Sequence, residues 1–163
     1  MKLLRIDGDR FDFEFSPVEK ELFFHALNLY PLVPESHHRL TKGKQMPGQR
    51  ENQRLLEETI QSQRDENRKE IATWLDEPER FTRSGEDWRV QFDRDDLEWL
   101  LQVMNDIRVG SWIAVGSPEH SQEQPMETDP DSLRNLLRME IAGSFEMYFL
   151  GAANGSWPPE TNG

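Results

Sequence analysis

The hydrophobic pattern opens with two short runs that flank a turn. Residues 3–6 read Leu-Leu-Arg-Ile, and residues 11–15 read Phe-Asp-Phe-Glu-Phe. The second run alternates strictly between apolar and polar side chains, which is typical of a strand with one buried face. With Gly8 and Asp9 as a two-residue turn, these runs form a β-hairpin. Its predicted cross-strand pairs are Ile6 with Phe11, Leu4 with Phe13, and Arg5 with Asp12.

A second hairpin is predicted further along the chain. Residues 81–83 and 88–92 flank Ser84-Gly85-Glu86-Asp87. The alternation in the second of these runs places Trp88, Val90 and Phe92 on one face of its strand.

Each hairpin leads directly into a helix with a strong start signal. Ser16 is followed three residues later by Glu19, and Asp93 by Asp96, which is the spacing of a capping box. The helix after Ser16 extends to about Asn28, with its apolar face at Val18, Leu22, Phe23, Ala26 and Leu27. In the helix after Asp93, the residues predicted to face inward are Leu97, Leu100, Leu101, Met104, Ile107 and Trp112. Trp99 and Val103 make this apolar stripe wider.

Two further helices complete the predicted elements. One spans about residues 49–75 and carries no apolar residue between Gln61 and Glu70. That stretch is either a solvated span or part of a polar contact surface, because a helix that is polar all round is not packed in an apolar core. The other follows the cap Asp129-Pro130 and spans about 130–150. Its predicted inward residues are Leu133, Leu136, Leu137, Ile141, Phe145, Tyr148 and Phe149.

These elements predict an α+β, mostly helical fold with two β-hairpins in a small antiparallel sheet and four helices. We expect residues 1–150 to form a single domain, residues 116–128 a mobile loop, and residues 151–163 a disordered tail. Sliding the chain by 77 residues aligns Gly8 with Gly85 and Ser16 with Asp93. A ββαα pseudo-repeat with halves 1–76 and 77–150 would explain this agreement, and so would two unrelated units of the same type.

Composition narrows the range of functions. The 163 residues contain no cysteine, which excludes disulfides, thiolate zinc sites and a cysteine nucleophile. A formal net charge of −12 repels nucleic acid and anionic lipid. The segment 36–50 is locally basic, with Arg39, Lys42, Lys44 and Arg50, and keeps nucleic-acid binding as a third hypothesis. With no signal-peptide pattern and no long apolar run, we expect a cytoplasmic protein without membrane contact.

The sharpest polar cluster is formed by Asn105, Asp106 and Arg108, which interrupt an otherwise apolar helix. One interpretation is a structural network that joins this helix to the hairpins, and the other is a ligand or partner site. Glu21 and His25 are weaker candidates, since their i, i+4 spacing could supply two metal ligands.

Other chemistry has little support in the sequence. His37-His38 and the acidic run Asp93–Asp96 are weak metal evidence, and acidic residues also stabilise any helix start. Neither a nucleophile elbow nor a phosphate-binding glycine loop is present. We therefore expect no catalytic residue, no metal and no cofactor. Trp157 stands apart from the apolar stripes and could belong to a partner-binding tail.

Four stretches resemble an uncharacterised bacterial family, best represented in actinobacteria and often encoded beside the Clp protease adaptor gene. They are residues 15–22, the strand 88–92 with residues 99–108, the polar helix after Gln49, and the final helix that begins with Asp-Pro. The family's helix usually continues Leu-x-Leu-Gly after its arginine, whereas this chain has Val109-Gly110-Ser111-Trp112. The loop 116–128 is also longer and more polar.

Two function hypotheses follow. The first is a non-enzymatic protein-interaction or regulatory domain that binds an unknown protein or a second copy of itself. The family's gene neighbourhood links this hypothesis to regulated proteolysis. The alternative is a small-ligand or metal-binding protein, or a hydrolase, with a pocket near Asn105, Asp106 and Arg108.

Overall fold

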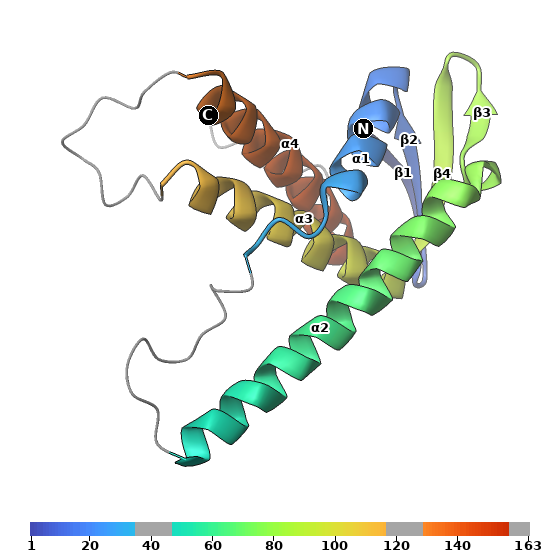
Figure 1. The fold of residues 1–163 in the computed structure, drawn as a ribbon. Helices are drawn as coiled ribbons and strands as arrows, with labels where there is room; N and C mark the ends of the chain where they lie inside the picture. Colours follow the sequence, from blue (N-terminus) through green and yellow to red (C-terminus); the bar gives the residue numbers. More distant parts are fainter. Residues whose placement is uncertain (35–46, 117–128, 157–163) are drawn as a thin grey trace.

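The computed structural model describes residues 1–34, 47–116 and 129–156 (Figure 1). Two hairpins and four helices in these ranges confirm the predicted α+β, mostly helical fold. The elements in chain order are β1 (Lys2–Asp7), β2 (Arg10–Phe15), α1 (Pro17–Leu29), α2 (Pro47–Asp76), the short 3₁₀ helix η2 (Pro78–Arg80), β3 (Thr82–Ser84), β4 (Asp87–Asp93), α3 (Arg94–Ala114) and α4 (Pro130–Ala153).

The two hairpins join into one antiparallel sheet with the strand order β1-β2-β4-β3. Each hairpin turns at a glycine with positive φ, Gly8 at 61° and Gly85 at 67°, a conformation that costs glycine little. The two inner strands, β2 and β4, pair so that Phe13 lies opposite Val90.

The predicted register of the first hairpin is correct near the turn and wrong at its far end. Ile6 pairs with Phe11 and Arg5 with Asp12, but Phe13 pairs with Leu3 because of an irregularity in β1 between Leu3 and Arg5. An extra residue in one strand shifts every later pair by one position. Leu3 is therefore buried, and Leu4 is exposed.

Both capped helix starts have the predicted geometry. The Ser16 side chain accepts the backbone N–H of Glu19, and the Glu19 carboxylate accepts the backbone N–H of Ser16. Asp93 and Asp96 form the same reciprocal pair at the start of α3. The hairpin-to-helix connections are thus held by local hydrogen bonds.

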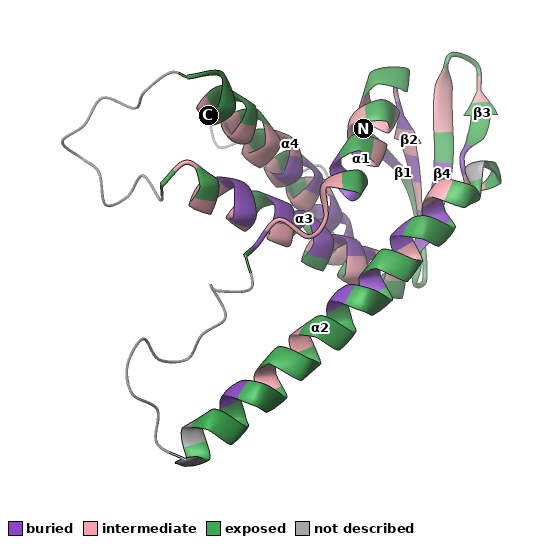
Figure 2. Cartoon of the chain, in the orientation of Figure 1, coloured by how far each residue is buried: buried purple, intermediate pink, exposed green. Residues whose placement is uncertain are grey.

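The core lies between one face of the sheet and all four helices (Figures 1 and 2). Phe23 of α1 lies within ring-contact distance of Trp74 of α2 and Phe149 of α4. Phe92 of β4 joins the same aromatic cluster. The opposite face of the sheet is polar, and the Gln91 amide there donates a 2.7 Å hydrogen bond to Asp12.

Three residues predicted to face the core are exposed instead. Val18 of α1 is 67% exposed, and Leu133 and Leu137 of α4 are 50% and 61% exposed. Leu133 and Leu137 lie on a different side of α4 from the buried Phe145 and Phe149, since twelve residues along a helix correspond to a turn of roughly 120°. The apolar stripe of α4 is broader than the side that the core covers.

The strands of the sheet agree with the 77-residue correspondence. Phe13 and Val90, which face each other at the middle of the β2–β4 ladder, are themselves 77 residues apart. The second helices depart from it, because α4 packs along the length of α3 whereas α2 meets α1 over a short contact. The strand order and the β2–β4 register agree with the 77-residue offset, and the pseudo-repeat of the two halves stays a prediction.

The predicted boundaries of the loops and tail change as well. α4 continues to Ala153, three residues into the predicted tail, because Ala152 is buried against the core. Residues 157–163 with Trp157, residues 117–128 of the expected loop, and His37, His38, Arg39, Lys42 and Lys44 lie outside the described residues. Among the helices described, none combines the length and apolar character needed to span a bilayer.

Candidate functional site

Asp106, on the second half of α3, holds the chain segment that leaves α1. Its Oδ1 accepts the backbone N–H of Leu32 at 2.6 Å and that of Val33 at 3.3 Å. These N–H groups follow the end of α1 and have no helical partner, so the carboxylate satisfies donors that would otherwise be buried.

Gly110 lies one helical turn after Asp106 and makes room for the same segment. A Cβ at this position would come within 2.4 Å of the Leu32 Cβ and 2.8 Å of the Val33 nitrogen. The backbone of the segment therefore presses directly on the backbone of α3. Asp106 and Gly110 are i, i+4 neighbours, so they lie on the same face of the helix. We call Asp106, Gly110, Leu32 and Val33 the α3 clamp.

Arg64 of α2 reaches the clamp from the other side. It is 6% exposed, and its Nη2 donates a 2.6 Å hydrogen bond to the Val33 carbonyl. The same nitrogen lies 4.0 Å from Asp106 Oδ2, so the hydrogen bond to the carbonyl is the shorter contact. The charge of a buried guanidinium is tolerated because a carboxylate and a carbonyl lie close by.

Asn67 adds a second polar contact between α2 and the end of α1. It is 3% exposed, donates to the Tyr30 hydroxyl at 3.0 Å, and accepts from the Gln63 amide at 3.0 Å. Burial raises the pKa of Tyr30 above its ordinary value, and the hydrogen bond from Asn67 opposes part of that shift. The polar stretch of α2 is therefore a polar contact surface within the chain, one of the two predicted alternatives.

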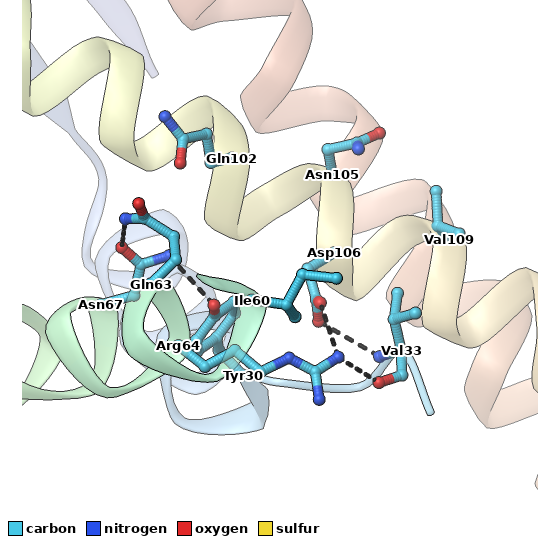
Figure 3. A pocket seen from close by; sticks show the side chains of 10 residues that line it. All are labelled: Tyr30, Val33, Ile60, Gln63, Arg64, Asn67, Gln102, Asn105, Asp106 and Val109. Carbon is cyan, nitrogen blue, oxygen red and sulfur yellow. Dashed lines mark hydrogen bonds and ion pairs between the residues drawn. The ribbon is translucent and has the colours of Figure 1, made fainter. Parts of the chain in front are cut away.

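A pocket of about 370 Å³ lies between these elements (Figure 3). The residues that line it are Tyr30, Val33, Ile60, Gln63, Arg64, Asn67, Gln102, Asn105, Asp106 and Val109. Amide groups of α2 and α3 give it hydrogen-bonding capacity. The Asp106 carboxylate at its base is already engaged by backbone N–H groups. Because the carboxylate is engaged and most of the exposed lining is apolar, the pocket suits a small ligand with few polar groups better than acid–base chemistry at Asp106.

The side chains of the three residues in the predicted polar cluster do not share one contact in the structure. Asp106 turns toward α2 and the segment after α1, whereas Asn105 points away from that contact (Figure 3). Arg108 donates to the side-chain oxygen Oδ1 of Asn105 at 3.1 Å, and its Nε lies 2.7 Å from the Glu146 carboxylate of α4. The predicted connection to the hairpins is therefore wrong. The partners are other helices and a loop, because the hairpins meet α3 only near its start.

The ion pair between Arg108 and Glu146 ties α3 to α4. Burial raises the pKa of Glu146, and the neighbouring Arg108 works against that rise. Arg108 is itself 46% exposed at its side chain, so solvent screens the pair.

The weaker candidates, Glu21 and His25, lie one turn apart on α1, and both are exposed. Within residues 1–34, 47–116 and 129–156, no group of three histidine, aspartate or glutamate side chains is placed to hold a metal ion. Asp93 and Asp96 of the acidic run cap α3, and burial raises the pKa of Asp96.

Sequence reasoning overlooked Tyr30, Arg64, Asn67 and Gly110. A signal for two of them exists, because Ile60, Arg64, Asn67, Ile71 and Trp74 follow one another at alternating steps of four and three. The polar residues thus continue the buried stripe of α2, which marks them as buried polar groups that need partners.

Comparison of the chain with models of protein families, with curated proteins and with solved structures finds no match.

Proposed function

We propose that the chain is a non-enzymatic protein-interaction domain, and that the first half of α2 is the element that binds the partner. The observation that supports this proposal is the way α2 is attached. Its 30 residues make a rod roughly 45 Å long. Its buried apolar residues, Ile71 and Trp74, lie near its C-terminal end, and the first half extends away from the other described elements (Figure 1).

The extended half has a surface suited to protein contact. Leu55 is 50% exposed, and Arg54 beside it forms ion pairs with Glu51 at 2.9 Å and Glu58 at 3.6 Å. Such pairs support an isolated helix by only a few tenths of a kcal/mol each. Helices in proteins derive most of their stability from tertiary packing. A partner that covers Leu55 would supply that packing.

Site-specific photo-crosslinking in the native host tests the proposal. A photoreactive phenylalanine analogue at position 55 should give one defined adduct with another protein. The same analogue at Val18, a still more exposed apolar position on α1, is the control. An excess of unlabelled wild-type chain should abolish the adduct, whereas the same excess of the Leu55→Glu chain should leave it in place. Identical adducts from positions 55 and 18, or none from position 55, would contradict it.

We further propose that this protein interaction takes part in regulated proteolysis. Its support is the resemblance of residues 15–22 and 99–108 to a family whose genes adjoin the Clp adaptor gene. Titration of the chain with purified Clp adaptor and with the Clp chaperone ring should then show saturable binding by calorimetry. Absence of binding to both, together with a partner adduct at position 55, would remove the link to proteolysis and leave the interaction function.

A second candidate function is small-ligand binding in the pocket between α2 and α3. Its support is the set of amide side chains around a space of about 370 Å³. A ligand that binds only the native state must raise the thermal midpoint of the chain. Screening polar metabolites, nucleotides and metal ions by thermal shift, with Gln102→Ala as the matched variant, tests this alternative. No shift at saturating concentrations would exclude it.

A further inference from the structure

Among the described residues that line the pocket between α2 and α3, two carry a charge, and both are already paired within the chain. The Arg64 guanidinium donates to the Val33 carbonyl at 2.6 Å and lies 4.0 Å from the Asp106 carboxylate. The same carboxylate accepts the backbone N–H of Leu32 at 2.6 Å. A charged ligand would lose its hydration shell beside a balanced pair that offers it no counter-charge. The pocket therefore favours an uncharged ligand.

The phenol of Tyr30 adds no charge to the pocket. Burial raises the pKa of Tyr30, so its hydroxyl stays protonated at neutral pH. That hydroxyl accepts a hydrogen bond from Asn67 at 3.0 Å. Its own proton has no acceptor in the part of the chain that the structure describes. An acceptor atom of a ligand can therefore take this proton.

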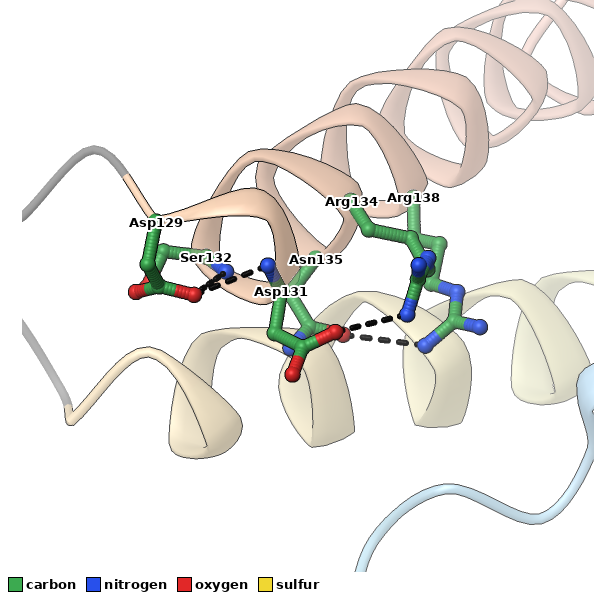
Figure 4. A network of polar contacts seen from close by, with 6 residues as sticks. All are labelled: Asp129, Asp131, Ser132, Arg134, Asn135 and Arg138. Atoms are coloured by element: carbon green, nitrogen blue, oxygen red, sulfur yellow. Dashed lines mark hydrogen bonds and ion pairs between the residues drawn. The ribbon is translucent and has the colours of Figure 1, made fainter.

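Gln102 lines the pocket from α3 and carries an amide without a hydrogen-bond partner among the described residues. An engaged amide differs in this respect. At the start of α4, the side-chain oxygen of Asn135 accepts from Arg138 at 3.0 Å (Figure 4). The Gln102 amide keeps both its donors and its acceptor for a ligand.

Gln63 of α2 lines the same end of the pocket as Gln102 (Figure 3). Its amide nitrogen donates to Asn67 at 3.0 Å, which leaves the amide oxygen as an acceptor. A side-chain amide presents its acceptor and its donors in one plane. It therefore matches a ligand edge on which one donor and one acceptor are adjacent, as glutamine and asparagine match the edge of adenine.

The apolar part of the described lining comes from Val33, Ile60 and Val109. These side chains can contact the faces of a ring and offer it no hydrogen bond. The volume of about 370 Å³ lies near the lower end of the range for ligand pockets. A ligand that satisfies both parts of the lining has an apolar ring and a single polar edge.

We propose that this pocket binds a flat, uncharged ring compound with one amide edge, as in aromatic carboxamides and cyclic amides. The proposal rests on the second candidate function, small-ligand binding between α2 and α3, and adds the chemical class of the ligand. In the complex, Gln102 and Gln63 pair with the amide edge of the ligand, and the apolar side chains contact its ring.

Compounds that share one ring and differ in charge test the chemical class. Benzamide is neutral, benzoate is an anion and benzylamine is a cation at neutral pH. In NMR titrations of the isotope-labelled full chain, benzamide and the cyclic amide 2-pyridone should move the side-chain amide resonances of Gln63 and Gln102. Benzoate and benzylamine should bind at least about tenfold more weakly, because the pocket offers their charge no partner. Equal or stronger binding of either charged compound would overturn the proposal.

A pair of variants tests the contact with Gln102. Gln102→Leu keeps most of the size of the side chain and removes an amide that has no partner in the described part of the chain, so the fold should be retained. Benzamide binding should weaken about threefold to tenfold, which is the loss expected for one hydrogen bond. Gln61→Leu makes the same change at an exposed position of α2 outside the pocket lining and should leave the affinity unchanged. Equal affinities of Gln102→Leu and the wild type would refute the proposed pairing.

The thermal-shift screen of metabolites, nucleotides and metal ions separates this proposal from the function on which it rests. If a charged compound stabilises the wild type and not Gln102→Leu, the pocket binds a ligand and only the proposed chemical class is wrong. If no compound in either experiment binds, the chemical class and the second candidate function are both wrong.

Discussion

The backbone N–H of Leu32 donates to the Asp106 carboxylate across 2.6 Å, although 74 residues separate the two. This contact joins the end of α1 to the middle of α3. Together with Arg64, which donates to the Val33 carbonyl, it anchors the connection from which the chain goes on to α2. The polar residues around the pocket are therefore also residues that hold the helices in place.

Asp106→Ala should destabilise the protein by about 1–3 kcal/mol, because it leaves the N–H groups of Leu32 and Val33 without their acceptor. Urea unfolding followed by circular dichroism measures this change. Asn105→Ala, at the exposed neighbouring position, should change stability by less than about 0.5 kcal/mol. Equal losses for the two variants would show that the carboxylate does not stabilise the clamp.

Gly110→Ala and Gly143→Ala should have opposite effects, although both replace a glycine within a helix. At position 110 the new methyl group would overlap Leu32, and the overpacking should cost about 1–3 kcal/mol. At position 143 the nearest atom would be the Arg108 Cδ at 3.7 Å, an ordinary contact. There the higher helix propensity of alanine should stabilise by up to about 1 kcal/mol. Thermal unfolding of the two variants distinguishes these outcomes, and a stabilised Gly110→Ala would contradict the clamp geometry.

Glu146 should make the stability of the protein depend on pH in the acidic range. Burial raises its pKa in the folded state, so the folded protein binds more protons than the unfolded chain as the pH passes through the carboxylate range. The contribution of Glu146 is greatest below its unfolded pKa and is lost as the pH rises through the folded pKa. The stability of the wild type relative to Glu146→Gln should therefore fall as the pH is raised from acid to neutral. A rise over that interval would show that the attraction of Arg108 outweighs burial.

Lys20→Met should destabilise the protein by about 0.5–2 kcal/mol, because the Lys20 ammonium lies 3.5 Å from the centre of the Trp88 ring. Methionine keeps most of the aliphatic length and removes the charge. Lys2→Met, at an exposed strand position away from these rings, is the control. Equal unfolding midpoints for the two variants would indicate that the cation does not stabilise this contact.

The secondary structure followed from residues close together in the chain. Gly8 and Gly85 supplied the positive φ of the turns, and Ser16 and Asp93 supplied the caps, because these features depend on groups within a few residues. The register of the first hairpin was predicted at Ile6 but not at Leu3. A bulge depends on how the strand meets the core and has no clear local signal.

The candidate site could be predicted only in part. Asp106 stood out as a charge within an apolar helix, and the polar stretch of α2 was recognised as a possible contact surface. The pairing of Asp106 with the segment after α1 could not be read from the chain, since no local rule specifies which loop crosses a helix. The need for glycine at position 110 likewise arises only because the segment at Leu32 packs against α3 there.

Local chemistry in the sequence therefore accounts for the hairpins, the capped helices and the chemical character of each surface. The three-dimensional packing decides which polar residues meet, as Arg64 and Asp106 do, and which apolar residues stay exposed, as Leu133 and Leu137 do. The physical reason is distance along the chain. Turns and caps depend on neighbouring residues, whereas burial depends on which side of each helix the other elements cover.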